Sequence, residues 1–155
     1  MTTTGPLLIA YDGSPNSRTA IGTAAHLLPG AAAVVLYARQ PLESLAAHLE
    51  GHPALEDLRG IDAATLNASE RIAAEGAELA RKAGLTADPH VSSTLATAAE
   101  AIVEAADGLG ARAIVLGSRG RSGVTAALLG STSAAVLHHT RRPVIVIPPS
   151  GEDLA

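Results

Sequence analysis

The stretch Ala113-Ile-Val-Leu-Gly-Ser-Arg-Gly-Arg-Ser-Gly-Val-Thr-Ala-Ala-Leu-Leu-Gly-Ser-Thr-Ser133 decides the fold class of this chain. It begins with a short apolar run, continues as a glycine- and hydroxyl-rich segment, and ends where a helix is predicted to start. A buried strand that runs through a glycine turn into a helix is typical of α/β domains. The small residues, the backbone amides and the side chains of Arg119 and Arg121 together suit a polyphosphate.

The same alternation of apolar runs and helical patterns extends outward in both directions. Asp12-Gly13 ends the first apolar run, and Ser14-Pro15 then predicts an N-cap and the first residue of a helix. Thr97 and Glu100 have the spacing of a capping box. The sequence predicts strands over residues 7–11, 31–38, 88–92, 113–116 and 144–147, and helices over residues 15–28, 62–83, 98–109 and 130–140.

Five short strands that alternate with helices predict one open parallel sheet covered by helices on both faces. We expect a single domain over residues 1–150 and a short C-terminal tail over residues 151–155. Residues 39–60 are broken up by proline and glycine, and only a short helix over residues 42–49 is predicted there. Ligands of such sheets bind beyond the carboxyl ends of the strands, where the Asp12-Gly13 turn and the glycine-rich segment would both lie.

Composition excludes several classes of function. The net charge of −4 and the 1% aromatic content argue against a nucleic-acid-binding protein. No apolar stretch of about 18 residues is present, so we expect no membrane span. The N-terminus lacks the pattern of a signal peptide and the chain has no cysteine, so we expect a cytoplasmic protein.

The histidines and carboxylates do not predict a metal site or a catalytic centre. His48 and His52 have the i, i+4 spacing of metal ligands on a helix, but Gly51 and Pro53 make that helix doubtful. No His-Glu-x-x-His pattern occurs, and no pair of carboxylates stands out as a catalytic dyad. We therefore expect neither a bound metal on protein ligands nor a catalytic residue.

The glycine-rich segment matches neither of two common phosphate-binding motifs. No Gly-Lys-Ser/Thr ending of a Walker A loop occurs, and the spacing of its glycines differs from the dinucleotide fingerprint. Ordinary turn chemistry is a competing explanation for isolated glycines. However, Gly117, two residues, Gly120, nine residues and then Gly130-Ser131 resembles the nucleotide-binding signature of the universal stress protein family. Residues 7–14, 113–123 and 142–148 resemble the family's first strand, its phosphate loop and its last strand.

This resemblance implies a Rossmann-like fold of the adenine nucleotide alpha hydrolase type, with strand order 3-2-1-4-5. It also implies an adenine-nucleotide site in which Asp12 accepts hydrogen bonds from the ribose or base side and Ala38 offers backbone groups to adenine. Asp12 could instead only close a turn, and Ser131 could be only a helix cap. The implied binding residues are Asp12, Gly13, Ala38, Gly117, Ser118, Arg119, Gly120, Gly130, Ser131, Thr132 and Ser133.

The resemblance implies a cytoplasmic module that binds ATP, with Mg²⁺, and acts in stress responses. A slow ATPase or a phosphotransferase to a partner protein is the alternative, and a member of the family that binds no nucleotide is a third. The apolar run of residues 144–147 is expected at a sheet edge, which tends to pair with another chain. A two-fold homodimer through this strand is therefore expected, with no nucleic-acid or membrane partner.

Overall fold

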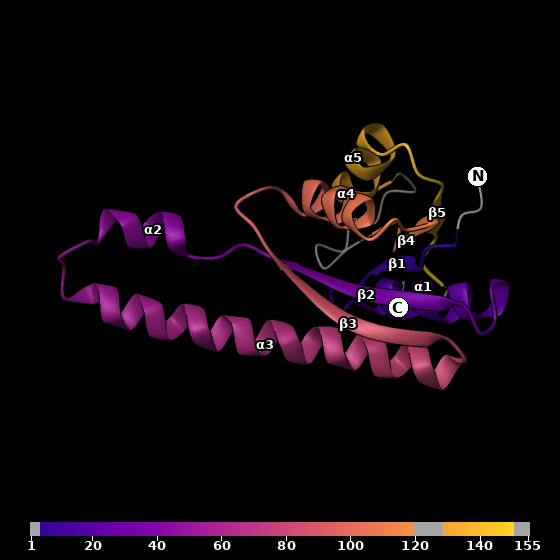
Figure 1. Cartoon of the computed structure of the whole chain (residues 1–155), viewed down its shortest axis with the longest axis horizontal. Coiled ribbons are helices and arrows are strands. Elements are labelled where there is room, and N and C mark those ends of the chain that lie inside the picture. Colours follow the sequence, from indigo (N-terminus) through magenta and orange to yellow (C-terminus); the bar gives the residue numbers. More distant parts are fainter. Residues whose placement is uncertain (1–3, 120–128, 151–155) are drawn as a thin grey trace.

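Five parallel strands form one open sheet in the order β3-β2-β1-β4-β5 (Figure 1). The computed structural model describes residues 4–119 and 129–150. The strands are β1 (Leu7–Ala10), β2 (Ala32–Arg39), β3 (Thr86–Ser93), β4 (Ala113–Gly117) and β5 (Val144–Ile147). The predicted strand order is confirmed. β1 and β4 are neighbours, so the chain reverses its direction of winding between them.

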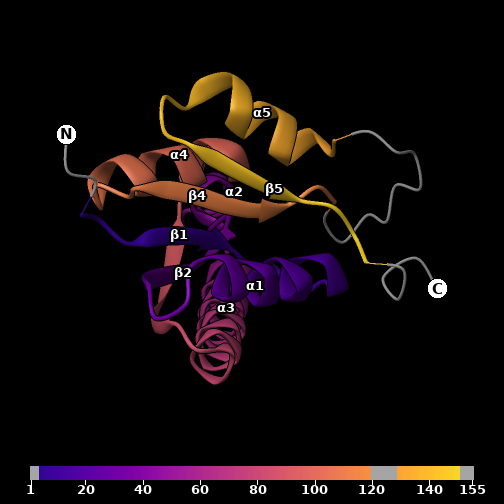
Figure 2. The ribbon, with the colours of Figure 1, turned by 90° about the vertical axis from the view of Figure 1, so that its right-hand side faces the viewer.

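Helices cover both faces of the sheet (Figure 2). α1 (Pro15–Leu27) and α3 (Ala54–Ala83) lie on one face, and α4 (Ala98–Gly108) and α5 (Ser131–His139) lie on the other. Successive strand residues point to opposite faces, so Leu7 and Ile9 enter the core under α1 and α3 while Leu8 enters the core under α4 and α5. The central strands β1 and β4 are apolar because both of their faces are buried, whereas the edge strand β3 is mostly polar and exposed.

The predicted helix boundaries rest on local hydrogen bonds that the structure contains. The Ser14 hydroxyl accepts the N–H of Ser17 at 3.2 Å, and Pro15 is the first residue of α1. At the start of α4, Thr97 and Glu100 form the complete capping box. Gly84 ends α3 with a φ of +109°, a left-handed conformation that glycine adopts without strain.

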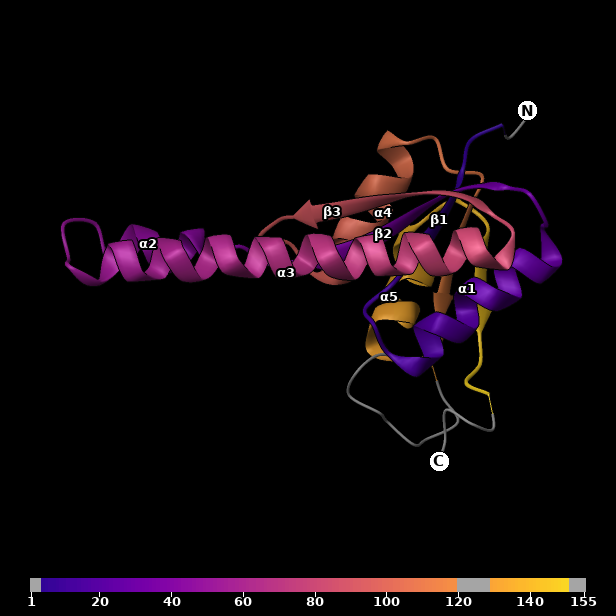
Figure 3. The ribbon, with the colours of Figure 1, turned by 90° about the horizontal axis from the view of Figure 1, so that it is seen from below.

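The helix α3 is longer than the sequence predicts. It begins at Ala54 rather than Asp62 and spans 30 residues, or about 45 Å at 1.5 Å per residue. Its first half extends beyond the sheet together with α2 (Glu43–His48), and we call residues 43–66 the α2–α3 arm (Figures 1 and 3). The prediction failed because Gly60 was interpreted as a break, whereas it lies within the exposed part of the helix.

A partly buried ion pair lies at the base of the arm. The guanidinium of Arg39, at the end of β2, bonds to the carboxylate of Asp62 in α3. The same carboxylate oxygen accepts the N–H of Leu42 at 3.1 Å, so Asp62 joins the helix to the chain that leaves the sheet. This contact fixes where the arm departs from the body of the molecule.

The strand β3 extends one to two residues beyond the predicted range at each end. It contains Pro89, which has no N–H to donate to a neighbouring strand. Since β3 pairs only with β2 and lies at the edge of the sheet, the proline is tolerated there. The edge position of β5 is also as predicted. Within the described residues, no helix combines the length and apolarity that crossing a membrane requires.

Candidate functional site

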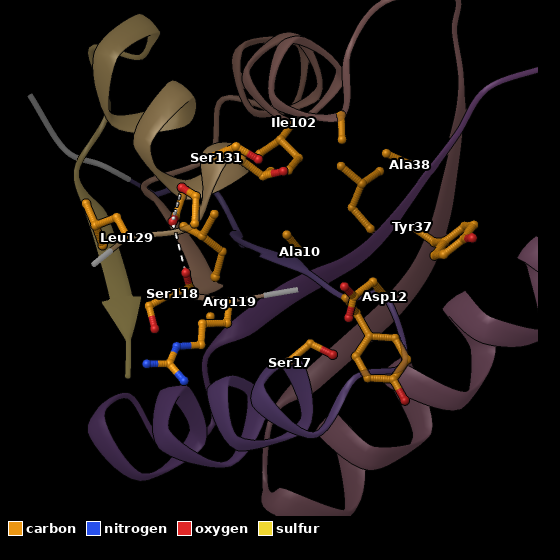
Figure 4. Close-up of a pocket in the computed structure, with 18 residues that line it drawn as sticks. Ala10, Asp12, Ser17, Tyr37, Ala38, Ile102, Ser118, Arg119, Leu129 and Ser131 are labelled. Atoms are coloured by element: carbon orange, nitrogen blue, oxygen red, sulfur yellow. Dashed lines mark hydrogen bonds between the residues drawn. The ribbon is translucent and has the colours of Figure 1, made fainter. Parts of the chain in front are cut away.

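A cavity of about 440 Å³ lies at the carboxyl ends of β1 and β4, where the winding of the sheet reverses (Figure 4). This is the position at which open parallel sheets bind their ligands. Its walls come from the ends of three strands and the first turns of three helices. The lining residues are Ala10, Tyr11, Asp12, Ser17, Leu36, Tyr37, Ala38, Ala98, Ile102, Leu116, Gly117, Ser118, Arg119, Leu129, Gly130, Ser131, Thr132 and Ser133.

One wall of the cavity is polar and combines the residues after β4 with the start of α5. The N–H of Gly130 donates to the carbonyl of Ser118 at 2.6 Å. The Ser133 hydroxyl lies 3.0 Å from the carbonyl oxygen of Gly130 and 3.3 Å from that of Ser118. A Cβ on Gly130 would lie 2.8 Å from the Ser118 carbonyl oxygen, so the close approach of the two segments requires glycine.

The polar wall is well suited to an anion. Gly130 is the N-cap of α5 and provides no side chain to cap it, and no acidic residue lies in the first turn. The first amides of a helix have no intrahelical acceptor, and the helix dipole favours negative charge there. Ser131, Thr132 and Ser133 form this turn at the cavity. Arg119 also lines the cavity, and its guanidinium extends toward α1 (Figure 4). The alternative assignment of Ser131 as the cap is wrong, since Ser131 is the first helical residue.

Another part of the cavity lining, which we call the apolar wall, carries no polar side chain. It is formed by Ala10 and Leu36 from two strands, by Leu116 from β4, and by Ala98 and Ile102 from α4. Leu36, Ile102 and Leu116 belong to the core under α4 and α5, so this wall is held by the packed interior. The cavity therefore offers an apolar surface to one end of a ligand and hydrogen-bond donors to the other.

Asp12 follows β1 and lines the cavity beside Ser17 and Tyr37 (Figure 4). Its Oδ1 accepts the N–H of Ser14 at 2.9 Å, so the carboxylate does close the turn into α1. It also lines the cavity. Gly13 has a φ of +81°, which favours glycine, and its part is in this turn rather than in the cavity lining.

The ring of Tyr11 extends from the cavity toward α3. Its hydroxyl donates a hydrogen bond to Oε1 of Glu75, which also accepts one from Arg18 at 3.1 Å. Burial raises the pKa of Tyr11, and the bond to Glu75 raises it further. The hydrogen bond from Tyr11 lowers the pKa of Glu75, with Arg18 adding to the effect. These three side chains connect Tyr11, which lines the cavity, to α1 and α3.

Comparison with known proteins identifies the family of this chain. Residues 4–148 match the model of the universal stress protein family. The chain belongs to the universal stress protein family. A universal stress protein of Mycobacterium tuberculosis and one of Mycobacterium bovis are each 34% identical to it over 142 residues, which is 91% of this chain. The alignment covers 44% of each of these relatives, so the chain spans less than half of their length.

Solved universal stress proteins share the fold. UspA from Lactobacillus plantarum superposes with a TM-score of 0.66 at 22% identity, covering 93% of this chain and 97% of that one. A universal stress protein from Archaeoglobus fulgidus, solved in complex with dAMP, gives 0.59 at 23% identity, covering 92% and 97%. Another universal stress protein, solved in complex with cAMP, gives 0.59 at 22% identity, covering 94% and 98%.

The structure gathers most of the predicted site residues around the one cavity. The residues that line it are Asp12, Ala38, Gly117, Ser118, Arg119, Gly130, Ser131, Thr132 and Ser133. Gly13 does not line it. Gly120 and Arg121 lie outside the described residues, so the middle of the family signature remains a prediction.

Sequence reasoning missed the apolar wall and part of the remaining lining. Ile102 lies within the helix predicted over residues 98–109, and nothing local to this helix indicates that it begins over a cavity. Ser17 and Tyr37 also line the cavity without belonging to any motif. Tyr37 could have been found from its position, because it directly precedes the predicted binding residue Ala38 at the end of β2.

The paired histidines do not share a helix. α2 ends at His48, and His52 follows it in the connection to α3, where its Nδ1 accepts the N–H of Ala54 at 3.0 Å. Over residues 4–119 and 129–150, no three His, Cys, Asp or Glu side chains are grouped as metal ligands.

Proposed function

We propose that this chain binds an adenine nucleotide, ATP together with Mg²⁺, in the cavity at the ends of β1 and β4. We further propose that it acts in the cytoplasm as a regulatory module of a stress response. The observation that carries the proposal is the division of the cavity into an apolar wall and an amide- and hydroxyl-rich wall. A nucleotide has the same division, with a flat base at one end and phosphates at the other.

The size and charges of the cavity support this occupant. Its volume of about 440 Å³ lies within the range of small-molecule sites. The phosphates would lie against the first turn of α5 and near Arg119, where amides and a cation offset their charge. The base would lie against Ile102 and the end of β2.

The carboxylate of Asp12 would serve the nucleotide in one of two ways. As an acceptor it would bond the hydroxyls of the ribose, and as an anion it would help to hold the cation that accompanies the phosphates. Mg²⁺ keeps several waters and is commonly bound through substrate phosphates and one or two carboxylates, so a single protein carboxylate is compatible with it. The dAMP and cAMP complexes of related proteins support an adenine nucleotide as the class of ligand.

Thermal unfolding with and without ATP and Mg²⁺ tests the proposal. At a nucleotide concentration of about 100 Kd, binding adds about 2.7 kcal/mol to the free energy of unfolding. For a chain of this length we expect Tm to rise by about 5–10 °C. Asp12→Ala should lose most of this rise, whereas Asp57→Ala, an exposed carboxylate in the arm, should keep it.

An unchanged Tm of the unaltered chain at millimolar ATP would rule the proposal out and favour a family member that binds no nucleotide. Sustained release of ADP over many turnovers, abolished by Asp12→Asn, would favour the slow ATPase or phosphotransferase. The two measurements together therefore separate three possible functions.

We also propose a homodimer through β5. Val144–Ile147 forms one edge of the sheet, and its first three residues are only partly buried. An uncovered apolar edge strand offers backbone groups and side chains to a second copy. Sedimentation equilibrium at micromolar concentration should give twice the mass of the chain, and the mass of a monomer would contradict the proposal.

A further inference from the structure

Asn16 is a buried polar residue that does not line the cavity. It is the second residue of α1 and is 4% exposed. Its Oδ1 accepts the N–H of Arg119 at 2.8 Å, and its Nδ2 donates to the carbonyl of Ile147 at 3.2 Å. A backbone N–H can only donate and a carbonyl can only accept, so both partners require the same orientation of the amide. One side chain thus joins α1, the residues after β4 and the end of β5.

Gly117 provides the space that Asn16 occupies. A Cβ on Gly117 would lie 2.7 Å from both Cγ and Oδ1 of Asn16, closer than a real Cβ contact allows. The family resemblance places Gly117 among the nucleotide-binding residues. In the structure, a side chain at position 117 would instead collide with Asn16 of α1. We attribute the glycine at this position to the packing of Asn16.

The two bonds of Asn16 fix the first residues of the polar wall. The carbonyl of Ile147 also accepts the N–H of Ser118 at 2.8 Å, so consecutive amides are held in place, one by β5 and the next by Asn16. Ser118 and Arg119 both line the cavity. A wall that is ordered before the ligand arrives avoids the entropy cost of ordering on binding.

We infer that Asn16 is a positioning residue for the nucleotide: it holds Ser118 and Arg119 in their binding geometry from outside the cavity, in the space that Gly117 leaves. The inference rests on the proposed nucleotide function. Asn16 itself is not part of the family signature that contains Gly117.

Isothermal titration with ATP and Mg²⁺ measures the effect on binding. Asn16→Ala should weaken the affinity for ATP by about tenfold, because the Arg119 N–H loses a buried acceptor. Asn67→Ala, at an exposed position of α3, is the matched control and should bind like the unaltered chain. An Asn16→Ala variant that unfolds at a lower temperature but keeps its affinity would overturn the inference and leave Asn16 a structural residue.

A double-mutant cycle tests the relation to Gly117. Gly117→Ala should weaken binding on its own, since its methyl group would displace the Asn16 amide. In a chain that already carries Asn16→Ala, the same change should add little, because the atoms it meets are gone. Equal and additive losses in both backgrounds would show that Gly117 does not serve Asn16.

Amide exchange in the nucleotide-free protein keeps this test separate from the proposed function. In Asn16→Ala the N–H of Arg119 should exchange on the order of tenfold faster. Asn16→Asp retains an acceptor oxygen and should keep that amide protected. If the unaltered chain binds no ATP, the function fails while this measurement still decides the role of Asn16, and unchanged exchange in Asn16→Ala would overturn it.

Discussion

The two halves of α3 belong to one continuous helix but meet different surroundings. Residues 72–83, which we call the body half, bury Ala73, Gly76, Ala77 and Ala80 against the sheet. Residues 54–66, the arm half, extend beyond the sheet with α2, and Ile61 there is 57% exposed. The body half thus buries small residues against the sheet, whereas the arm half leaves the larger Ile61 exposed.

The difference shows that the sheet, and not helix propensity, sets the sequence of the body half. A helix that lies close to a sheet needs small residues at the contact, whereas an extended arm only needs residues that favour a helix. The body half also supports the candidate site, because Gly76 and Glu75 both contact Tyr11, which lines the cavity. Substitutions in the two halves should therefore differ in both size and consequence.

The largest expected effect comes from the same substitution placed in each half. A Cβ on Gly76 would lie 2.6 Å from the Tyr11 ring and 2.7 Å from Val35, so Gly76→Val overpacks the core. We expect it to lower the free energy of unfolding by about 3 kcal/mol. Gly60 has no atom within 4 Å of an added Cβ, and Gly60→Val should change stability by less than about 0.5 kcal/mol.

Urea unfolding followed by circular dichroism measures both values under the same conditions. Equal losses in the two variants would mean that the halves are equally constrained, and the distinction between them would fail. A large loss confined to Gly76→Val would support it.

This contrast also explains how far sequence reasoning reached. The body half lies within the helix predicted over residues 62–83, where Ala73 and Ala80, seven residues apart, belong to one buried face. The arm half has no face buried against the sheet, and its Leu55, Leu58 and Leu66 line a groove with α2 instead. Gly60 and Pro53 were therefore taken as breaks, although proline suits the start of a helix and an exposed glycine costs only about 1 kcal/mol.

The residues of the candidate site also fall into two groups, those that local sequence predicts and those that it does not. Residues that act through local backbone geometry, such as Gly130 and the Asp12 turn, were found because small and turn-forming residues are recognisable in sequence. Ile102 and Asn16 act through contacts with segments far along the chain, and only the folded sheet brings those segments together. Local sequence patterns therefore do not predict these long-range contacts.

The second prediction concerns the contact that holds the arm. The Arg39 side chain is 4% exposed, and its Nε has no hydrogen-bond partner among the described residues. Asp62→Ala would leave this charge buried without its carboxylate and would also remove the acceptor of Leu42. Since Asp62 itself is partly exposed, we expect a loss of about 2 kcal/mol, below the range for fully buried pairs.

Glu70→Ala is the control for this substitution, because Glu70 is an exposed carboxylate on the same helix. It should change the free energy of unfolding by less than about 0.5 kcal/mol. If Asp62→Ala unfolds at the same urea concentration as Glu70→Ala, the ion pair does not stabilise the base of the arm.

The smallest expected effect is a pH dependence in the body half. The hydrogen bond from Tyr11 and the charge of Arg18 hold the pKa of Glu75 below its usual value of 4.5. A carboxyl with a lowered pKa in the folded state stabilises the protein above pH 4.5, and this stabilisation is lost as the pH falls through the folded-state pKa. Because the Glu75 side chain is half exposed, we expect it to amount to less than about 1 kcal/mol.

Glu75→Gln removes this titration, so the stability difference between the unaltered chain and the variant should be constant above pH 6. It should shrink as the pH is lowered from about 5 to 3.

Tyr11→Phe keeps the carboxyl but removes its main hydrogen-bond donor, so Glu75→Gln made in a Tyr11→Phe chain should show a much weaker pH dependence. Urea unfolding at each pH provides the free energies. If the pH dependence is equally steep in the Tyr11→Phe chain, the lowered pKa of Glu75 is due to Arg18 alone. The Tyr11 hydroxyl would then have no part in it.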